Sequence, residues 1–301
     1  MPIDDIFLFR PLRRGVPPLG FRSDSKERAD IPADWTVWAF SDAHGADDAF
    51  GLALYRASLT DEKGHWSGDP RIALVGVGDY IDRGPDSAAL VERLRRLDGE
   101  ITEAGSRLVL VRGNHEQMLA DIMRGSREWF GAWIDNGGEA TARSFGLSAI
   151  SRSMDVFAHE ISEAAPYLLR WMLDTLPYAR WRDILFVHAG LVPGASIADL
   201  PNDDGQLWDN QLFLPTRGLP GEPAFAKYVA EGVKRIIVGH IPLPGVIRVL
   251  HGGSTLMIDT NAPGTLYTSR HKQLPGALTL VRPDTSPLFD KVHRVTVPTV
   301  G

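Results

Sequence analysis

Five short apolar segments, each followed by polar residues and glycine, constrain the fold of this chain more than any other feature. They are TVWAF at 36–40, RIALVGV at 71–77, RLVLV at 107–111, ILFV at 184–187 and RIIV at 235–238. Nearly continuous apolar segments of this length are typical of strands that are buried on both faces. The sequence therefore predicts a sheet-containing core with polar residues at the carboxyl ends of its strands.

Helical patterns separate these segments. Residues 47–59 begin with two acidic residues, which the helix dipole favours in a first turn, and residues 87–97 repeat leucine and valine at helical spacing. The helix-like stretch from about 116 to 180 predicts a helical insert, and short runs after residue 246 predict further strands. We expect an irregular arm at 1–34, whose apolar patch docks on the body or on a partner, followed by a single α/β domain at 35–301.

Composition narrows the class of protein. The 301 residues are 44% hydrophobic and 23% charged, which indicates a globular chain with a sizeable core. A net charge of −6 offers no attraction for nucleic acid, and no apolar run is long enough to span a membrane. The chain contains no cysteine, which excludes disulfides and thiolate ligands. We expect a cytoplasmic protein without a secretory signal, and the sequence leaves the oligomeric state open.

Carboxylate, imidazole or amide groups stand beside glycine at all five strand ends. The strings are SDAHG at 41–45, GDYIDRG at 78–84, RGNHE at 112–116, HAG at 188–190 and GH at 239–240. Ligand sites in α/β proteins lie at the carboxyl ends of strands, and oxygen and imidazole ligands without sulfur suit Mn, Fe or Zn. These strand ends therefore predict a metal site, in which the two oxygens of Asp79 could bridge two ions.

The motifs DAHG, GDYIDRG, RGNHE, VHAGLVP and VGH occur in this order over about residues 36–261. They resemble the calcineurin-like metallophosphoesterases and, more narrowly, the phosphoprotein phosphatase family of serine/threonine phosphatases and its bacterial relatives. GDxxDRG followed by GNHE is a highly specific pair. The resemblance implies an α/β fold of four layers (also classed as α+β). In this fold helices flank a β-sandwich, and a helical insert is added to it. It also implies a hydrolase that cleaves phosphomonoesters by direct attack of a hydroxide bound to two metal ions.

The resemblance implies a role for each residue that matches a family motif. Two divalent ions, most readily Mn with Fe or Zn as alternatives, would be bound by Asp42, His44, Asp79, Asn114, His188 and His240, with Asp79 as the bridge. His115 would be the general acid, and Asp82 would orient it and raise its pKa. The planar guanidinium groups of Arg83 and Arg112 would bind the phosphate oxygens. The substrate would be a phosphorylated protein or a small phosphate ester.

Departures from the motifs leave the substrate open. Asn210 stands where bacterial relatives often carry an arginine that contacts the phosphate. Glu116 is interpreted either as the partner of an arginine or as a first-turn acid of the following helix. His251 belongs to an HGG string that lies downstream of the GH motif, in the wrong order for the family, and is interpreted as a turn residue.

Two alternative functions compete with a phosphatase. A dinucleoside-polyphosphate hydrolase could use the same scaffold, although such enzymes tend to have Asp where this chain has Glu116. A catalytically silent metal-binding scaffold belongs to another class, and the complete set of matching residues counts against it.

Overall fold

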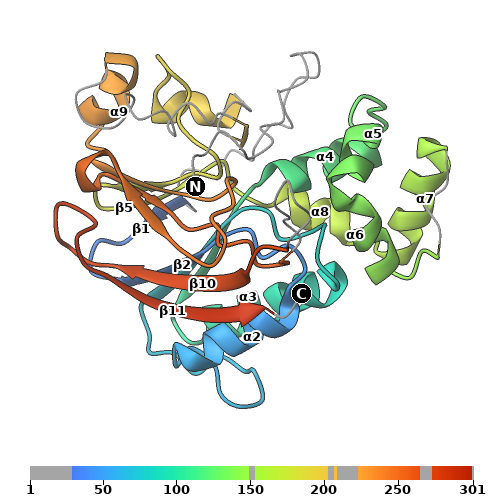
Figure 1. Ribbon diagram of the computed structural model, residues 1–301, viewed down its shortest axis with the longest axis horizontal. Coiled ribbons are helices and arrows are strands. Elements are labelled where there is room, and N and C mark those ends of the chain that lie inside the picture. The colour runs from blue at the N-terminus through green and yellow to red at the C-terminus, as the bar shows by residue number, and fades with distance from the viewer. Residues whose placement is uncertain (1–28, 149–152, 203–206, 209–222, 265–272, 300–301) are drawn as a thin grey trace.

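The computed structural model describes residues 29–148, 153–202, 207–208, 223–264 and 273–299, and two β-sheets form its centre (Figure 1). The five-stranded sheet has the order β11-β10-β2-β3-β4. Its strands β2, β3 and β4 are parallel, and β10 runs antiparallel to both β2 and β11. The bounds are β2 Thr36–Phe40, β3 Ile72–Val77, β4 Arg107–Val111, β10 Gly276–Pro283 and β11 Val292–Thr299.

The six-stranded sheet has the order β1-β5-β6-β7-β9-β8. Strands β6, β7 and β9 are parallel, so their carboxyl ends meet at the same edge. The bounds are β1 Asp30–Ile31, β5 Ala179–Trp181, β6 Ile184–Phe186, β7 Arg235–Val238, β8 Arg248–Leu250 and β9 Thr255–Met257. All five strands predicted from the apolar segments are confirmed, and β2, β4 and β7 have the predicted bounds.

Two short strands contradict the sequence interpretation. Residues 30–31 were expected to be irregular, yet they pair in parallel with residues 180–181. Residues 179–181, at the end of the predicted helical stretch, form β5 because they also pair with β6. Segments this short show no periodicity, so their long-range pairing was invisible. Residues 1–28 of the expected arm lie outside the described part of the chain, and the division into an arm and one domain stays a prediction.

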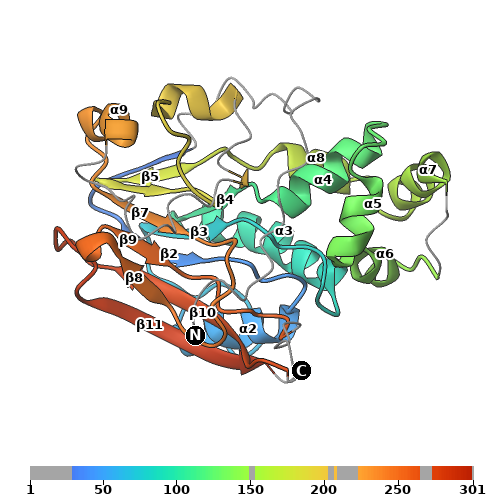
Figure 2. The same cartoon turned by 45° about the horizontal axis from the view of Figure 1, so that its top comes forward.

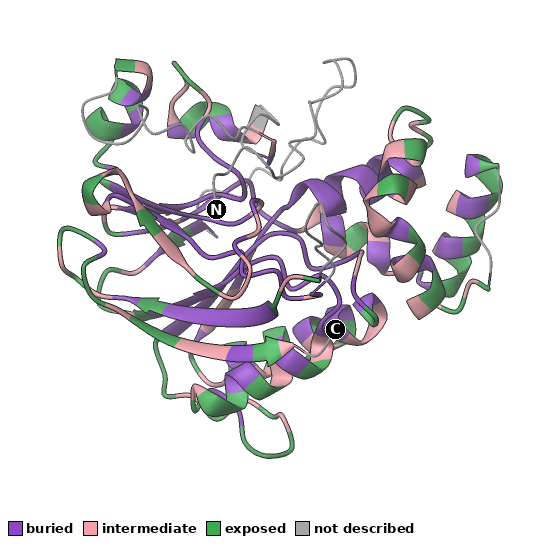
Figure 3. Ribbon diagram, viewed as in Figure 1, coloured by how far each residue is buried: buried purple, intermediate pink, exposed green. Residues whose placement is uncertain are grey.

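The hydrophobic core lies between and around the sheets in layers. Val75 and Val109 of one sheet belong to the same buried cluster as Leu185 and Ile236 of the other. Helices α2 (Asp47–Arg56) and α3 (Ser87–Glu103) cover the outer face of the five-stranded sheet, where Phe40 forms part of a second cluster. Short helices cover the other sheet, namely η3 (Ile197–Asn202), η6 (Pro223–Phe225) and α9 (Ala226–Ala230). The predicted four-layer α/β fold is confirmed, and Figure 3 shows the strands of both sheets as largely buried except the edge strands β8 and β11.

The helices that follow β4 gather beside the sandwich (Figure 2). They share a third core cluster that includes Met118, Trp133 and Phe157. Their bounds are α4 Asn114–Met123, α5 Phe130–Trp133, the π-helix η2 Ile134–Gly138, α6 Glu139–Ser144, α7 Met154–Ala164 and α8 Leu168–Leu173. In the described part of the chain, no helix combines the length and apolarity that a membrane crossing requires.

Candidate metal centre

The carboxylate of Asp79 stands at the centre of a buried cluster of histidines. Its Oδ2 atom lies 3.6 Å from Nε2 of His44, 3.8 Å from Nε2 of His115 and 3.4 Å from Nε2 of His188. Two sets of three potential metal ligands share this aspartate, namely His44, Asp79 and His115, and Asp79, His188 and His240. A residue common to two such sets occupies the position of a bridging ligand.

Asn114 and Asp42 complete the group of predicted ligands. Oδ1 of Asn114 lies 2.9 Å from Nε2 of His188 and 3.1 Å from Nδ1 of His240, so it faces the second set. Both oxygens of the buried Asp42 accept the backbone N–H of His240, at 3.1 and 3.0 Å. The structure thus brings all six predicted ligands together at the carboxyl ends of β2, β3, β4, β6 and β7, although Asp42 is absent from both three-residue sets.

The chemistry of this cluster fits divalent cations. Among the described residues, two of its buried atoms have no hydrogen-bond partner, Nε2 of His115 and Oδ2 of Asp259. Burial, with Asp259 close by, raises the pKa of Asp42 well above its usual range. Buried carboxylates such as those of Asp42 and Asp259 are stabilised when a cation is bound between them. Oxygen and imidazole donors in this mixture suit Mn, Fe or Zn.

His115 and Asp82 form the predicted pair. Nδ1 of His115 lies 2.7 Å from Oδ2 of Asp82, and both side chains are fully buried. Thr141 of α6 donates its hydroxyl to the other oxygen of Asp82, at 2.6 Å. The expected rise in the pKa of His115 is contradicted, because burial lowers this pKa to about 3 although Asp79 acts in the opposite direction. Burial also raises the pKa of Asp82 to about 8. The contact between Nδ1 of His115 and Oδ2 of Asp82 fixes the orientation of the imidazole ring.

The two predicted phosphate-binding arginines point in different directions. Arg83 lies in the site, where its Nη1 is 3.0 Å from Nε2 of His44, and its backbone N–H donates to the carbonyl of Gly137 in η2. Arg112 is fully buried, and its guanidinium donates to the Thr175 hydroxyl, the Gln117 side chain and the Leu173 carbonyl. These contacts tie the end of β4 to the helical insert, which differs from the expected phosphate contact. The partner Thr175 is 63 residues away, so the sequence could not reveal it.

Backbone strain marks the same loops. Eleven described residues other than glycine have positive φ angles, and six of them are predicted site residues: Asp42, His44, Asp79, Asp82, Arg83 and His240. Such conformations cost about 1–3 kcal/mol each and concentrate where function requires them. Gly78, with φ of +90°, shows why the loops are tightly constrained, since a Cβ there would lie 2.5 Å from Nδ1 of His188. The strain is independent support for a functional site at this edge.

Glu116 was left out of the predicted site, but the structure gives it a central supporting position. Its Oε2 accepts the backbone N–H groups of Asp79 and Gly113, at 2.9 and 3.0 Å, and its Oε1 accepts that of Tyr80 at 2.8 Å. Glu116 is the first-turn acid of α4, as one of the two interpretations of the sequence expected. Through these hydrogen bonds it also joins the loop after β3 to the loop after β4. Its place three residues after Gly113, where helix-capping acids occur, was the signal in the sequence.

Four further residues bear on the predicted site, namely Asp259, His251, Asn210 and Trp208. Asp259, close to Asp42, was missed, and its position just after β9 was the available signal. His251 lies in the short helix η7 (His251–Gly253) after β8, and its Nδ1 is 3.0 Å from Oγ1 of Thr255, as suits a turn residue. Asn210 lies outside the described residues. Trp208, two residues earlier, stacks on Trp129 with the ring centres 5.3 Å apart.

Removal of the Glu116 charge should destabilise the protein. In Glu116→Gln the amide replaces one acceptor oxygen, so at least one buried backbone N–H is left without a partner. We expect the free energy of unfolding in urea to fall by about 2 kcal/mol or more. Glu163→Gln, at an exposed position of α7, is the matched control and should be near neutral. Equal unfolding midpoints for the two variants would refute the supporting role.

The layered sandwich and the cluster of aspartate, histidine and asparagine at its strand ends define a metallophosphoesterase. The sequence model of the family described as calcineurin-like phosphoesterase matches residues 36–257. Because this match covers more than half of the chain, the protein belongs to that family, whose members are hydrolases that use divalent metal ions.

Individual relatives are more distant. The chain is 36% identical over 82 residues to Shewanella-like protein phosphatase 1 of Plasmodium berghei, and the matched segment covers 27% of this chain and 22% of that protein. It is also 34% identical over 103 residues to serine/threonine-protein phosphatase 1 of Salmonella typhimurium, and the matched segment covers 34% of this chain and 39% of that protein. These matches span less than half the length of either relative. A solved cold-active protein-tyrosine phosphatase of Shewanella has a TM-score of 0.57 at 18% identity, with 90% of this chain and 84% of that chain covered, which supports the fold.

Proposed function

We propose that this protein is a phosphatase that hydrolyses phosphomonoesters, either phosphoserine and phosphothreonine in proteins or a small phosphate ester. The observation that carries this proposal is the buried His115–Asp82 pair beside Asp79. Nε2 of His115 lacks a hydrogen-bond partner among the described residues, so it is available to the leaving oxygen of an ester. The relatives with protein phosphatase names support the same class of reaction.

The proposed metal ligands are Asp42, His44, Asp79, Asn114, His188 and His240. Two divalent ions held there would supply Lewis acidity toward the phosphoryl group and activation of the attacking water. His115 would donate the hydrogen on Nε2 to the leaving oxygen, while Asp82, whose burial raises its pKa to about 8, would supply the hydrogen at Nδ1 in its place. Arg83 would donate hydrogen bonds to the phosphate oxygens and help offset the charge that develops there.

For Arg112 we propose a role other than phosphate binding. Its guanidinium holds Thr175, Gln117 and the Leu173 carbonyl, so Arg112 is proposed as a positioning residue for the loop that carries Asn114. Arg83 keeps the phosphate-binding role. A cytoplasmic location remains a prediction from the sequence.

The first test is metal dependence. After removal of metals with EDTA, release of p-nitrophenol from p-nitrophenyl phosphate should fall to background, and Mn²⁺ should restore it more fully than Fe²⁺ or Zn²⁺. Activity should depend on metal because the proposed nucleophile is a water molecule that the bound ions would activate. A phosphoserine peptide and diadenosine tetraphosphate should be assayed in parallel, and preference for the latter would favour the dinucleoside-polyphosphate hydrolase. Failure to turn over any phosphate ester with any of the three metals, at neutral and alkaline pH, would contradict the proposal.

A further inference from the structure

The helical insert contacts two consecutive residues of the candidate site, Asp82 and Arg83. The backbone N–H of Asp82 donates to the Thr141 hydroxyl of α6 at 2.8 Å, and the same hydroxyl donates to Oδ1 of Asp82 at 2.6 Å. The backbone N–H of Arg83 donates to the carbonyl of Gly137 in η2 at 3.1 Å. Two neighbouring positions of the insert therefore hold the aspartate that orients His115 and the arginine that is proposed to bind phosphate.

The backbone at Asp82 and Arg83 is strained, so its position depends on such contacts. The φ angles of the two residues are +73° and +65°, a region that residues other than glycine rarely adopt. Conformations of this kind persist only where the surrounding structure over-determines them. Thr141 is fully buried, and its hydroxyl satisfies both the N–H and the carboxylate of Asp82. The insert therefore stabilises a turn that is unfavourable by itself.

The insert also fits closely around Arg83. Gly137 has a φ angle of +93° within the π-helix η2, and a Cβ added there would lie 3.0 Å from Cγ of Arg83 and 3.1 Å from its Cα. A side chain at this position would therefore press on Arg83 and move it. Single π-helical turns occur frequently at functional sites, and this one presents its carbonyl to a residue of the candidate site.

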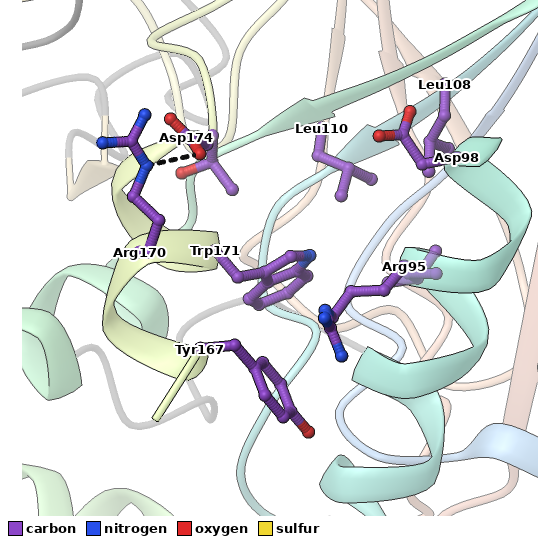
Figure 4. A pocket seen from close by; sticks show the side chains of 10 residues that line it. Arg95, Asp98, Leu108, Leu110, Tyr167, Arg170, Trp171 and Asp174 are labelled. Carbon is purple, nitrogen blue, oxygen red and sulfur yellow. Dashed lines mark hydrogen bonds and ion pairs between the residues drawn. The ribbon is translucent and has the colours of Figure 1, made fainter. Parts of the chain in front are cut away.

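The other end of the insert packs less closely against the sandwich. A cavity of about 430 Å³ lies between α8 and α3, and Figure 4 shows Trp171 of α8 and Leu110 of β4 in its wall. The contacts of Gly137 and Thr141 with the site are by contrast direct hydrogen bonds. These two residues are therefore the part of the insert that sets the position of Asp82 and Arg83.

We propose that Thr141 and Gly137 are positioning residues for the reaction. This inference rests on the proposed function, in which His115 protonates the leaving oxygen and Arg83 binds the phosphate. Thr141 holds the carboxylate of Asp82 against Nδ1 of His115, which directs Nε2 of the ring toward the leaving oxygen. Gly137 sets the backbone at Arg83, which determines where its guanidinium meets the phosphate oxygens. Thr141 therefore acts on protonation, and Gly137 acts on phosphate binding.

Thr141→Val tests the first role, because it removes the hydroxyl and keeps the shape of the side chain. The Ser87 hydroxyl, 3.0 Å from the backbone nitrogen of Asp82, still accepts its N–H, so the variant should fold. We expect kcat to fall about tenfold for a phosphoserine peptide and less than about twofold for p-nitrophenyl phosphate, since a poorer leaving group depends more on an oriented acid. Thr141→Ser restores the hydroxyl and should restore kcat for the peptide.

Thr60→Val is the matched control for this pair of variants. Thr60 is buried like Thr141, but its hydroxyl has no hydrogen-bond partner among the described residues, so both rates should stay as in the wild type. Equal losses for the two substrates in Thr141→Val, or no rescue by serine, would overturn the role of Thr141.

Gly137→Ala tests the second role. The added Cβ should displace Arg83, so we expect KM for p-nitrophenyl phosphate and the inhibition constant of inorganic phosphate to rise together by about tenfold, with a smaller change in kcat. Gly125→Ala is the matched control, because Gly125 has a φ angle of +96° and an added Cβ there meets no atom within 4 Å. It introduces the backbone strain alone and should leave both constants unchanged. Unchanged inhibition by phosphate in Gly137→Ala would overturn the role of Gly137.

Hydrogen exchange separates this inference from the proposed function. It is measured by mass spectrometry on the Mn²⁺-loaded full chain without substrate, for a peptide that contains Asp82 and Arg83. Exchange should be about fivefold faster in Thr141→Val and Gly137→Ala, and unchanged in the two control variants. A wild-type chain that turns over no phosphate ester would refute the phosphatase alone, and faster exchange would still support the positioning contacts. Unchanged exchange in either variant would overturn the role of that residue.

Discussion

The replacement Asp79→Asn is expected to lower kcat/KM for p-nitrophenyl phosphate by a factor of at least about a thousand. Oδ2 of Asp79 lies 3.4–3.8 Å from the Nε2 atoms of three histidines and belongs to both three-residue ligand sets. Asparagine keeps the shape and one oxygen, but it removes the negative charge and one donor from the bridge. The steady-state rate over a range of Mn²⁺ concentrations measures the effect.

Metal content separates this explanation from simple misfolding. The wild-type chain, loaded with Mn²⁺ and desalted, should retain about two ions, and Asp79→Asn should retain fewer while keeping a cooperative unfolding transition. Asp69→Asn, at an exposed position, is the matched control and should resemble the wild type in both respects. Full activity in Asp79→Asn would overturn the proposed bridge, and full metal content with lost activity would assign Asp79 a role other than ligand.

Local signals explain why so much of the sandwich could be predicted from the sequence. Strands such as β2, β4 and β7 are continuous apolar segments, and their pattern needs no knowledge of the partner strand. The site loops follow these strands directly, and ligand sites lie at the carboxyl ends of strands. Residues such as Asp42 and His240, which are 198 positions apart, were therefore expected in one place, although their strands belong to different sheets. The position of the potential ligands followed from topology together with family resemblance.

Long-range partners explain most of what could not be predicted. No local pattern around Arg112 predicts that Thr175 will accept its hydrogen bond. Likewise, no local pattern around residues 30–31 predicts that they will pair with β5. The lowered pKa of His115 follows from its burial, and its partner Asp82 is supported by Thr141 from 59 positions away. In each case the local pattern was compatible with several partners, and tertiary packing selected one.

The role of His115 gives the second large expected effect, because the structure allows two explanations of its position. Its Nε2 lies 3.8 Å from Oδ2 of Asp79, so it could act as a metal ligand, whereas its Nδ1 contact with Asp82 favours a general acid. As a general acid it matters most when the leaving group is a poor one. We therefore expect His115→Asn to lower kcat for a phosphoserine peptide by about 10²–10⁴-fold, and for p-nitrophenyl phosphate by much less.

The comparison of leaving groups and metal content decides between the two explanations. A general acid predicts unchanged Mn²⁺ content in His115→Asn and a loss that grows as the leaving group becomes poorer. Asp82→Asn should show the same trend with a smaller loss, since the imidazole remains but is less well oriented. His65→Asn, at an exposed loop, is the control and should behave as wild type. Equal losses for both substrates, together with reduced metal content, would instead make His115 a ligand and require another source for the proton.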